Sequence, residues 1–308
     1  MPLLHPRLVT WAGIAALTCI AAVAIAGAPS AKIEGWYAPT LGGKQIWSDH
    51  FYYGGWRIQE NALTGHYRLL DSDDRRHTWG SFEKCLAVFR ERQTAGRVAP
   101  QGGHLVILLH GILRSGGSFS KFEARLNEAG YQTAAISYAS TRREIEDHGT
   151  ILGGLLDRLE GVNRVSFVTH SMGALVYREM LSQRRNWQDR ITQERVVMIA
   201  PPNQGAQLAD QLRGLSAYQA VYGRSGQQLT TRAVDNIPIP GGEFGIIAGG
   251  RGTAEGYNPI VPGDDDSVVS VVETQLPGAA DHLVIDALHS TILSDPRTAD
   301  AVIAFLAT

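Results

Sequence analysis

Ser171 lies between an apolar segment typical of a buried strand and a segment with helical spacing. Residues 165–174 have the sequence VSFVTHSMGA, and Leu175, Val176 and Met180 continue the helical pattern. A serine on a tight turn from a strand to a helix exposes its hydroxyl, and the helix N-terminus behind it stabilises negative charge. The pattern therefore predicts a nucleophilic serine at this position.

The residues around Ser171 match such a turn only in part. The strained backbone at the nucleophile requires small residues two positions away on either side. Gly173 meets this requirement, whereas Thr169 takes the place of the usual first glycine. A buried serine that merely begins a helix is the alternative interpretation.

Backbone donors for a developing oxyanion are predicted from an earlier loop. Residues 105–109 form an apolar run that predicts a strand, and the loop 110–113, HGIL, follows it directly. In a doubly wound sheet this loop lies beside the serine turn, at the carboxyl ends of the strands. We expect the N–H groups of Ile112 and Met172 to form an oxyanion hole, since Met172 follows the nucleophile.

A phosphate-binding loop is a second hypothesis for the same segment. Residues 111–118, GILRSGGS, match the pattern G-x-x-x-x-G-K-S except at the lysine. Gly117 takes the place of this lysine, whose charge reaches the phosphates in such loops. The sequence therefore favours an oxyanion loop over a nucleotide site.

Three consecutive aspartates are candidates for the acid that orients a catalytic base. Asp264, Asp265 and Asp266 follow a glycine-rich loop after a predicted strand at 243–248. We prefer Asp266 because it directly precedes residues 267–269, SVV, where the apolar pattern returns. A solvated acidic turn and a calcium loop built from several of these carboxylates are the alternatives.

His289 is the predicted base among ten histidines. It follows the apolar run 283–288, which predicts the last strand, so it should lie on a loop at the carboxyl edge of the sheet. His282 is the second choice, but it begins this strand at the opposite edge. His170 would point away from the serine turn, and His110 is expected to be structural.

These residues must be positioned by the elements around them, which alternate between strand and helix from residue 104 onward. Strands are predicted at 105–109, 132–138, 164–169, 195–200 and 243–248, and helices near 118–129, 147–160 and 171–184. Continuous apolar strands joined by amphipathic helices predict an α/β core with a mostly parallel, doubly wound sheet over residues 104–308.

Residues 32–103 carry a different pattern, dense in aromatic residues and turn signals. A hairpin is predicted from 46–53 and 56–60, followed by a third strand ending at residue 70, a charged loop at 71–77 and a helix at 81–92. We expect an N-terminal extension packed on the core, with its hairpin continuing one edge of the parallel sheet. Cys85 should face the buried side of its helix, and no internal disulfide is predicted because Cys19 lies in the N-terminal segment.

The chain begins with an uncharged, largely apolar segment from Leu8 to Ala31, just after Arg7. About 20 apolar residues can span a bilayer, and small residues near Ala26 offer cleavage sites. Residues 1–31 are therefore predicted to be a signal peptide or an N-terminal membrane anchor. Arg7 favours a cytoplasmic N-terminus, so we expect the catalytic body to be exported (periplasmic or secreted) or anchored outside the cytoplasm.

Composition argues against a nucleic-acid partner. The net charge of −2, without a basic stripe, gives no basis for binding nucleic acid. No cofactor and no metal site is predicted, apart from the calcium loop named above as an alternative for the three aspartates. The expected partners are a small-molecule or lipid ester substrate and, through the N-terminal segment, a membrane.

Over residues 104–306 the chain resembles the α/β-hydrolase superfamily, within it the bacterial lipase and esterase branch. The resemblance rests on the segments 169–173 (THSMG), 110–112 (HGI), 202–205 (PNQG), 266–269 (DSVV) and 289–290 (HS). Thr169 and Ser267 depart from the pattern of these lipases at positions usually held by glycine. The order Ser171, Asp266, His289 matches the chain order of the triad in this architecture. The resemblance implies an α/β-hydrolase fold and ester hydrolysis through an acyl-enzyme.

Several functional alternatives stay open on the same fold. A thioesterase, an amidase or an acyltransferase could use the same residues. A non-catalytic binding scaffold would be expected to have lost a member of the triad, and none is lost. Leu208, Leu212, Leu215 and Tyr218 recur at helical spacing and predict an amphipathic helix, either packed on the sheet or acting as a mobile lid.

Overall fold

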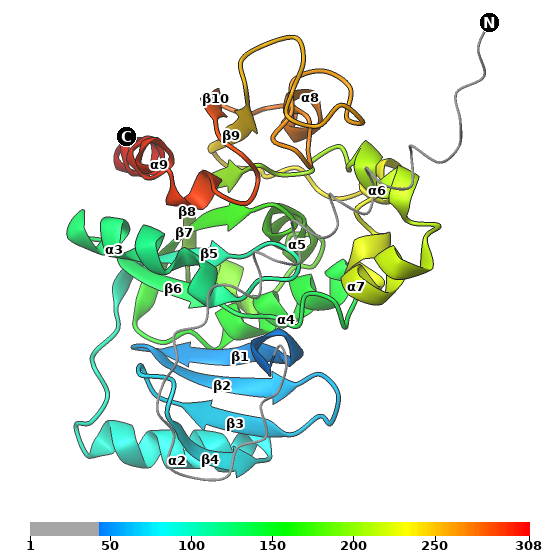
Figure 1. Cartoon of the computed structure of the whole chain (residues 1–308). Coiled ribbons are helices and arrows are strands. Elements are labelled where there is room, and N and C mark those ends of the chain that lie inside the picture. Colours follow the sequence, from blue (N-terminus) through cyan, green and yellow to red (C-terminus); the bar gives the residue numbers. More distant parts are fainter. Residues whose placement is uncertain (1–42) are drawn as a thin grey trace, which may run out of the picture.

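The computed structural model of the chain describes residues 43–308 (Figure 1). The segment 1–31, for which a signal peptide or an anchor is predicted, lies outside these residues, as do residues 32–42 of the predicted extension. Over the part that is described, no helix has both the length and the apolar character needed to cross a membrane.

A parallel sheet of six strands, in the order β10-β9-β8-β7-β5-β6, forms the core of residues 43–308. Its strands are β5 (Gly103–Leu109), β6 (Gln132–Ile136), β7 (Val162–His170), β8 (Thr192–Ile199), β9 (Phe244–Gly250) and β10 (Asp281–Asp286). The predicted α/β core with a mostly parallel sheet is confirmed. The last strand ends at Asp286, so His289 lies three residues beyond it, on a loop at the carboxyl edge.

Helices cover both faces of this sheet, which explains why its strands are apolar throughout. In β5, alternate residues belong to two different apolar clusters, Leu105 and Ile107 to one and Val106 and Leu108 to the other. The first cluster includes residues of α4 (Ile145–Asp157) and α5 (Gly173–Met180), and the second includes residues of α3 (Ser120–Glu128) and α9 (Pro296–Ala307). Burial on both faces removes the alternation of polar and apolar residues that a half-exposed strand would show.

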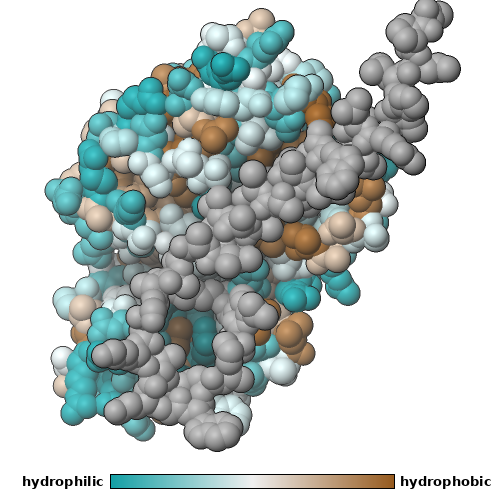
Figure 2. Space-filling model, viewed as in Figure 1, coloured by the Kyte–Doolittle hydropathy of each residue, from teal (hydrophilic) through white to brown (hydrophobic). Residues whose placement is uncertain are grey.

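The remaining helices of the core lie in connections between its strands. They are α6 (Gln207–Leu212), α7 (Ser216–Gln227) and α8 (Val271–Thr274), and short 3₁₀ turns occur at Gly116–Phe119, Asn186–Asp189, Thr231–Ala233 and Ile292–Ser294. The single amphipathic helix expected over 208–218 is thus divided into two. Leu208 and Tyr218 are buried, whereas Leu215 between the helices is 48% exposed. On the face shown in Figure 2, apolar residues gather in the region of α6 and α7.

An antiparallel sheet with the order β1-β2-β3-β4 precedes the core and lies below it in Figure 1. Its strands are β1 (Trp47–Tyr53), β2 (Trp56–Asn61), β3 (Tyr67–Leu70) and β4 (Arg76–Gly80), preceded by a 3₁₀ turn at Gly43–Ile46 and followed by α2 (Phe82–Thr94). Phe51, Ile58 and Leu69 of the sheet pack against Cys85 and Phe89 of α2. Cys85 is a free, fully buried thiol, as its position in the predicted helix indicated.

The expectation that the hairpin continues one edge of the parallel sheet is wrong. The four antiparallel strands form a separate sheet, and β1 meets the end of the edge strand β6 through a backbone hydrogen bond from Asp49 to the carbonyl of Ser137 (2.8 Å). The register of β1 shifts between Asp49 and Phe51, and the Asp49 carboxylate accepts the N–H of Ser137 (2.6 Å). The side chain of Asp49 therefore accepts the N–H of Ser137, which the backbone of a neighbouring strand would accept if β1 continued the parallel sheet.

Candidate active site

Ser171 occupies the turn between β7 and α5. Its φ angle is +54°, in a region that residues other than glycine rarely adopt, and its N–H donates to the carbonyl of Ile199 (2.9 Å). A Cβ atom at Gly173 would lie 2.3 Å from the carbonyl oxygen of Leu109, so no side chain fits there. The turn thus has the strained backbone and the close packing of a nucleophile elbow.

Thr169, the departure from glycine in this motif, is accommodated as an ordinary strand residue. It is the penultimate residue of β7 and pairs with Leu109 on one side and Met198 on the other. Its hydroxyl is buried without a hydrogen-bond partner among the described residues. The threonine thus fits the elbow without a clash, but with a buried polar atom left unpaired.

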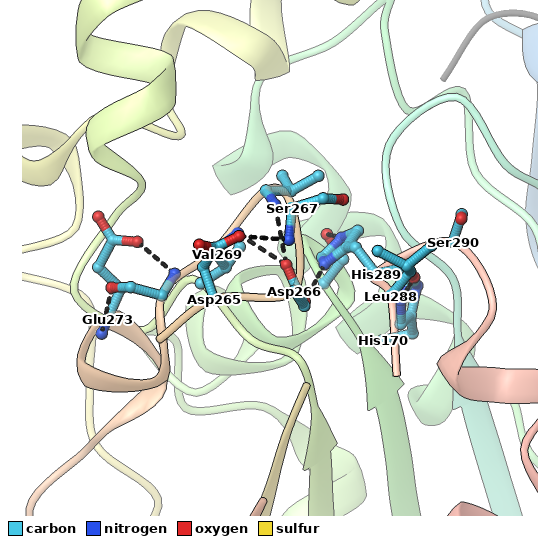
Figure 3. Close-up of polar contacts among 12 residues, drawn as sticks. His170, Asp265, Asp266, Ser267, Val269, Glu273, Leu288, His289 and Ser290 are labelled. Atoms are coloured by element: carbon cyan, nitrogen blue, oxygen red, sulfur yellow. Dashed lines mark hydrogen bonds and ion pairs between the residues drawn. The ribbon is translucent and has the colours of Figure 1, made fainter. Parts of the chain in front are cut away.

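The structure brings the side chains of Ser171, Asp266 and His289 together from three separate loops. Nε2 of His289 lies 2.9 Å from Oγ of Ser171, and Nδ1 lies 2.6 Å from Oδ2 of Asp266. In Figure 3 the side chains of Asp266 and His289 point toward one another. Asp266 is fully buried, whereas Ser171 is 6% exposed and the His289 side chain 13% exposed, so only the serine and the imidazole reach solvent.

The carboxylate of Asp266 is fixed by its own loop. Oδ1 accepts the N–H groups of Val268 (3.0 Å) and Val269 (2.8 Å), which leaves Oδ2 for the imidazole. The carbonyl of Asp266 also accepts the N–H of His289 (2.8 Å). These hydrogen bonds fix the carboxylate, and the paired loops hold the imidazole in one orientation.

The other two aspartates have different partners. Asp264 accepts the N–H groups of residues 251–252 (2.7 and 2.9 Å), and Asp265 accepts those of Asn258 and Ser267. Neither carboxylate bonds to the imidazole of the site. Within residues 43–308, no three His, Cys, Asp or Glu side chains are grouped as a metal site would require.

Ser267 stands where the related lipase pattern has glycine, and its backbone shows why that pattern uses glycine. Its φ angle is +84°, which glycine adopts without strain and serine does not. The N–H of Ser267 donates to Asp265 (2.6 Å) and its carbonyl accepts from Asn258 (2.9 Å). These bonds hold the strained backbone in the loop that carries Asp266.

The loop predicted to form the oxyanion hole lies against Ser171. A Cβ atom at Gly111 would lie 3.0 Å from Cβ of Ser171, so the loop and the elbow are in contact. The N–H groups of Ile112 and Met172 have no hydrogen-bond acceptor among the described residues. Two free backbone donors on the segments flanking the serine hydroxyl are what an oxyanion hole requires.

His110 fixes the orientation of this loop, in agreement with the structural role predicted for it. Its Nε2 accepts the N–H of Tyr138 (3.2 Å), so Nδ1 carries the proton and donates to the carbonyl of Gly111 (2.8 Å). Complete burial lowers the pKa of His110 to about 4, so the ring is neutral at physiological pH. Because the C=O and N–H of one peptide point in opposite directions, holding the Gly111 carbonyl also sets the direction of the next N–H, that of Ile112.

Two residues that the sequence did not indicate support the loop carrying His289. Nε2 of His170 contacts the carbonyl of His289 (3.2 Å), with the two rings 4.9 Å apart, and Figure 3 shows His170 beside this loop. Burial is the main cause that lowers the pKa of His170 well below its usual value, and the nearby His289 and Arg114 lower this pKa further. The neutral ring therefore donates its Nε2–H to the carbonyl of His289. Arg114 donates to the carbonyl of Ser290 (3.1 Å). His170 and Arg114 are each more than 100 positions from this loop in the sequence, so no local sequence pattern predicts these contacts.

The alternative phosphate loop finds no support in the geometry of residues 111–118. The N–H of Gly116 donates to Oγ of Ser137, and that of Leu113 donates to Oγ of Ser140, both at 3.1 Å. Two further N–H groups of the loop donate to its own carbonyls. The donors that would surround a phosphate are therefore occupied by contacts within the protein.

The second candidate for the base lies away from Ser171. His282 contacts Oγ1 of Thr274 (2.9 Å) near the start of β10. It borders a cavity of about 400 Å³, whose other lining residues are Gln204, Ile246, Gln275, Leu276, Pro277 and Ala279. His282 is therefore not part of the candidate site.

The sequence matches the model of a family described as a domain of unknown function, DUF7379, over residues 68–222, half of the chain. The matched region includes Ser171 and the loop 110–113 and ends before Asp266 and His289. A comparison with curated proteins found no match.

Solved structures similar to this chain include three enzymes. The mature lipase BlEst2 of Bacillus licheniformis has a TM-score of 0.55 at 20% identity, covering 65% of this chain and 91% of its own. The metagenomic carboxyl esterase MGS0156 has a TM-score of 0.52 at 18% identity, covering 69% and 78%. Phospholipase PlaB of Legionella pneumophila has a TM-score of 0.52 at 14% identity, covering 67% and 58%. These similarities show that the chain has the α/β-hydrolase fold, as the sequence predicted.

Proposed function

This chain belongs to the DUF7379 family, and we propose that it is a serine hydrolase that cleaves carboxylic esters through an acyl-enzyme. The observation that carries the proposal is the hydrogen-bonded series from the hydroxyl of Ser171 through His289 to Asp266, at 2.9 and 2.6 Å. A nucleophile bonded to a base, with the base oriented by a buried acid, is the arrangement that activates a serine.

In the first step of the proposed reaction, Oγ of Ser171 attacks the carbonyl carbon of the ester. Nε2 of His289 takes the hydroxyl proton, and the Asp266 carboxylate stabilises the imidazolium that forms. The C–O bond to the alcohol then breaks, and the imidazolium returns its proton to the leaving alkoxide. The acyl group remains on Ser171.

Water completes the proposed cycle. Nε2 of His289 takes a proton from the water that attacks the acyl-enzyme, and it returns this proton to Oγ of Ser171 as the acid leaves. In both steps the carbonyl oxygen becomes an oxyanion, which the N–H groups of Ile112 and Met172 would stabilise. Loss of one such donor typically reduces transition-state stabilisation by about 3–4 kcal/mol.

A carboxylic ester with an apolar acyl group is the proposed substrate class, either a small molecule or a lipid. Leu288 directly precedes the base and is exposed, and Ile112 and Leu113 of the oxyanion loop are only partly buried, so apolar surface borders the nucleophile. The similar structures are those of a lipase, a carboxyl esterase and a phospholipase, which agrees with this class. Thioesters, amides and acyl transfer to another acceptor are the competing classes.

Hydrolysis of p-nitrophenyl esters with acyl chains from two to twelve carbons tests the proposal. We expect measurable kcat/KM for the full chain and a loss of about 10³-fold or more in Ser171→Ala and in His289→Ala. Ser118→Ala, which changes a serine outside the site, should retain the activity. A folded protein that hydrolyses none of these esters, or a Ser171→Ala variant as active as the parent, contradicts the proposal. Activity confined to acyl thioesters or anilides would instead move the substrate to a competing class.

We also propose that residues 1–31 direct the chain out of the cytoplasm, on the basis of their uncharged, largely apolar sequence from Leu8 onward. Fractionation of expressing cells combined with N-terminal analysis of the mature chain tests this proposal. A new N-terminus near Ala26 in an exported fraction indicates a signal peptide, and an intact chain in the membrane fraction indicates an anchor. An intact chain in the cytoplasm contradicts both.

A further inference from the structure

We propose that Asp49 of the N-terminal sheet is a positioning residue for the oxyanion hole, acting through the segment 137–140 that follows β6. The inference rests on the proposed function, in which Ile112 supplies one oxyanion donor. It assigns a role to the antiparallel sheet, which contributes no side chain to the triad. The segment 137–140, SYAS, is called the bracing segment below.

Two successive residues of β1, Ser48 and Asp49, hydrogen-bond to the bracing segment. Asp49 donates its N–H to the carbonyl of Ser137 (2.8 Å) and accepts the N–H of the same residue on Oδ2 (2.6 Å). The hydroxyl of Ser48 accepts the N–H of Ala139 (3.1 Å). The backbone N–H and C=O of Ser137 are therefore both held by Asp49.

The bracing segment in turn holds the oxyanion loop 110–113 and the residues just after it. The hydroxyl of Ser140 accepts the N–H of Leu113, and the hydroxyl of Ser137 accepts the N–H of Gly116, both at 3.1 Å. The N–H of Tyr138 donates to Nε2 of His110 (3.2 Å). The rings of Tyr138 and His110 are stacked, with their centroids 4.0 Å apart and their planes at 11°. These contacts leave the imidazole one orientation.

His110 completes the connection to the donor. Nδ1 of its ring holds the carbonyl of Gly111 at 2.8 Å, and this peptide group carries the N–H of Ile112 at its other end. A continuous series of bonds therefore runs from the carboxylate of Asp49, through Ser137 and Tyr138, to the peptide that is proposed to stabilise the oxyanion. A rotation of that peptide would turn its N–H away from the substrate.

Asp49 is itself anchored on its side of the series. Its Oδ1 accepts from Nε2 of Gln59 (2.8 Å) on β2, and Oε1 of Gln59 accepts from the guanidinium of Arg68 (2.7 Å) on β3. Asp49, Gln59 and Ser137 are all buried. Burying a carboxylate costs free energy unless it is hydrogen-bonded, and each oxygen of Asp49 accepts one hydrogen bond, from Gln59 on one side of the contact between the two sheets and from Ser137 on the other.

Steady-state kinetics of Asp49→Ala with a p-nitrophenyl ester tests the inference. We expect kcat to fall about 10-fold or more while KM stays within about twofold, because the oxyanion donor acts in the transition state and not in substrate binding. Asp49→Asn retains one oxygen that can accept the N–H of Ser137, so it should restore most of the lost kcat. Phe89→Leu serves as the matched control: it weakens the packing of the same sheet on α2, so it should lower the melting temperature and leave kcat unchanged.

The outcomes separate this inference from the proposed function. If the parent protein neither hydrolyses esters nor reacts with a fluorophosphonate, the proposed function fails. If the parent is active and folded Asp49→Ala keeps its kcat, only the role of Asp49 fails. The role of Asp49 also fails if Asp49→Ala and Phe89→Leu lower kcat by the same factor for the same loss of melting temperature. A general loss of stability would then explain the lower kcat of both variants. Should Asp49→Ala not fold, Gln59→Leu removes the side-chain donor that fixes Oδ1 of Asp49, and an unchanged kcat in that variant overturns the inference.

Discussion

The hydrogen bond between His170 and the carbonyl of His289 links the residue before the nucleophile to the loop that carries the base. His170 touches neither substrate nor reacting atom, so its effect on catalysis passes through the position of His289. One neutral hydrogen bond contributes about 1 kcal/mol, which corresponds to roughly fivefold in rate if the bond is needed to align the imidazole.

His170→Leu should therefore lower kcat about three- to tenfold with little change in KM, as measured by ester hydrolysis. His170→Gln retains an N–H donor on a side chain of similar length, so it should recover most of the rate. Equal rates in the two variants would show that the hydrogen bond has no part in the effect.

Much of the residue-scale arrangement was predictable because it depends on chain order. Ser171 and His289 closely follow apolar runs, Asp266 follows the strand β9 after a glycine-rich loop, and residues that follow parallel strands meet at one edge of the sheet. The structure brings these three side chains together. The contacts of His170 and Arg114 were not predictable, because they join positions 119 and 176 residues apart and depend on the way two loops pack.

At the scale of elements, the turn from β7 to α5 depends on the absence of a side chain at Gly173. An added Cβ would lie 2.3 Å from the carbonyl oxygen of Leu109, and backbone atoms cannot move away as a flexible side chain can. The helix would have to shift from the sheet, carrying Ser171 and Met172 with it.

Gly173→Ala should lower kcat/KM by about 100-fold or more, since a displacement near 1 Å of the reacting groups has effects of this size. Gly214→Ala, between α6 and α7, is the matched control, because no atom lies within 4 Å of its added Cβ. Ester hydrolysis and thermal unfolding of the two variants measure the difference. A Gly173→Ala variant with the activity of the parent would falsify this account of the elbow.

The two sheets differ in how far the sequence predicts them. The strands of the parallel sheet are apolar throughout because helices cover both faces, and this signal is strong in a single sequence. β4 (Arg76–Gly80) was missed because it is short, charged and largely exposed, with the features of a loop. The separation of the antiparallel sheet from the core depends on the contact of Asp49 with Ser137, 88 positions apart, which local patterns do not contain.

At the scale of the whole molecule, buried neutral histidines link stability to pH. Burial lowers the pKa of His110 to about 4 and that of His148 to about 3, below the unfolded value near 6.5. The unfolded chain therefore binds more protons between these values, so the stability that each ring contributes is complete above about pH 6.5 and falls as the pH decreases. Burial raises the pKa of Asp49, which acts in the opposite sense, so a comparison of variants is needed to isolate one histidine.

His148→Gln should reduce the loss of unfolding free energy between pH 7.5 and pH 5 by about 2 kcal/mol relative to the parent, since each pH unit below 6.5 corresponds to about 1.4 kcal/mol per neutral ring. Urea denaturation at the two pH values measures this difference. An identical pH dependence in both proteins would mean that His148 is protonated alike in the folded and unfolded states.

Covalent labelling of the full chain with a fluorophosphonate, read by mass spectrometry, tests the central claim most directly, because the reagent reacts with a serine only when a base activates it. The account predicts one adduct, located on Ser171, which disappears in Ser171→Ala and forms far more slowly in His289→Ala. A folded protein that does not react, or an adduct on another residue, would contradict the assignment of Ser171 as the nucleophile.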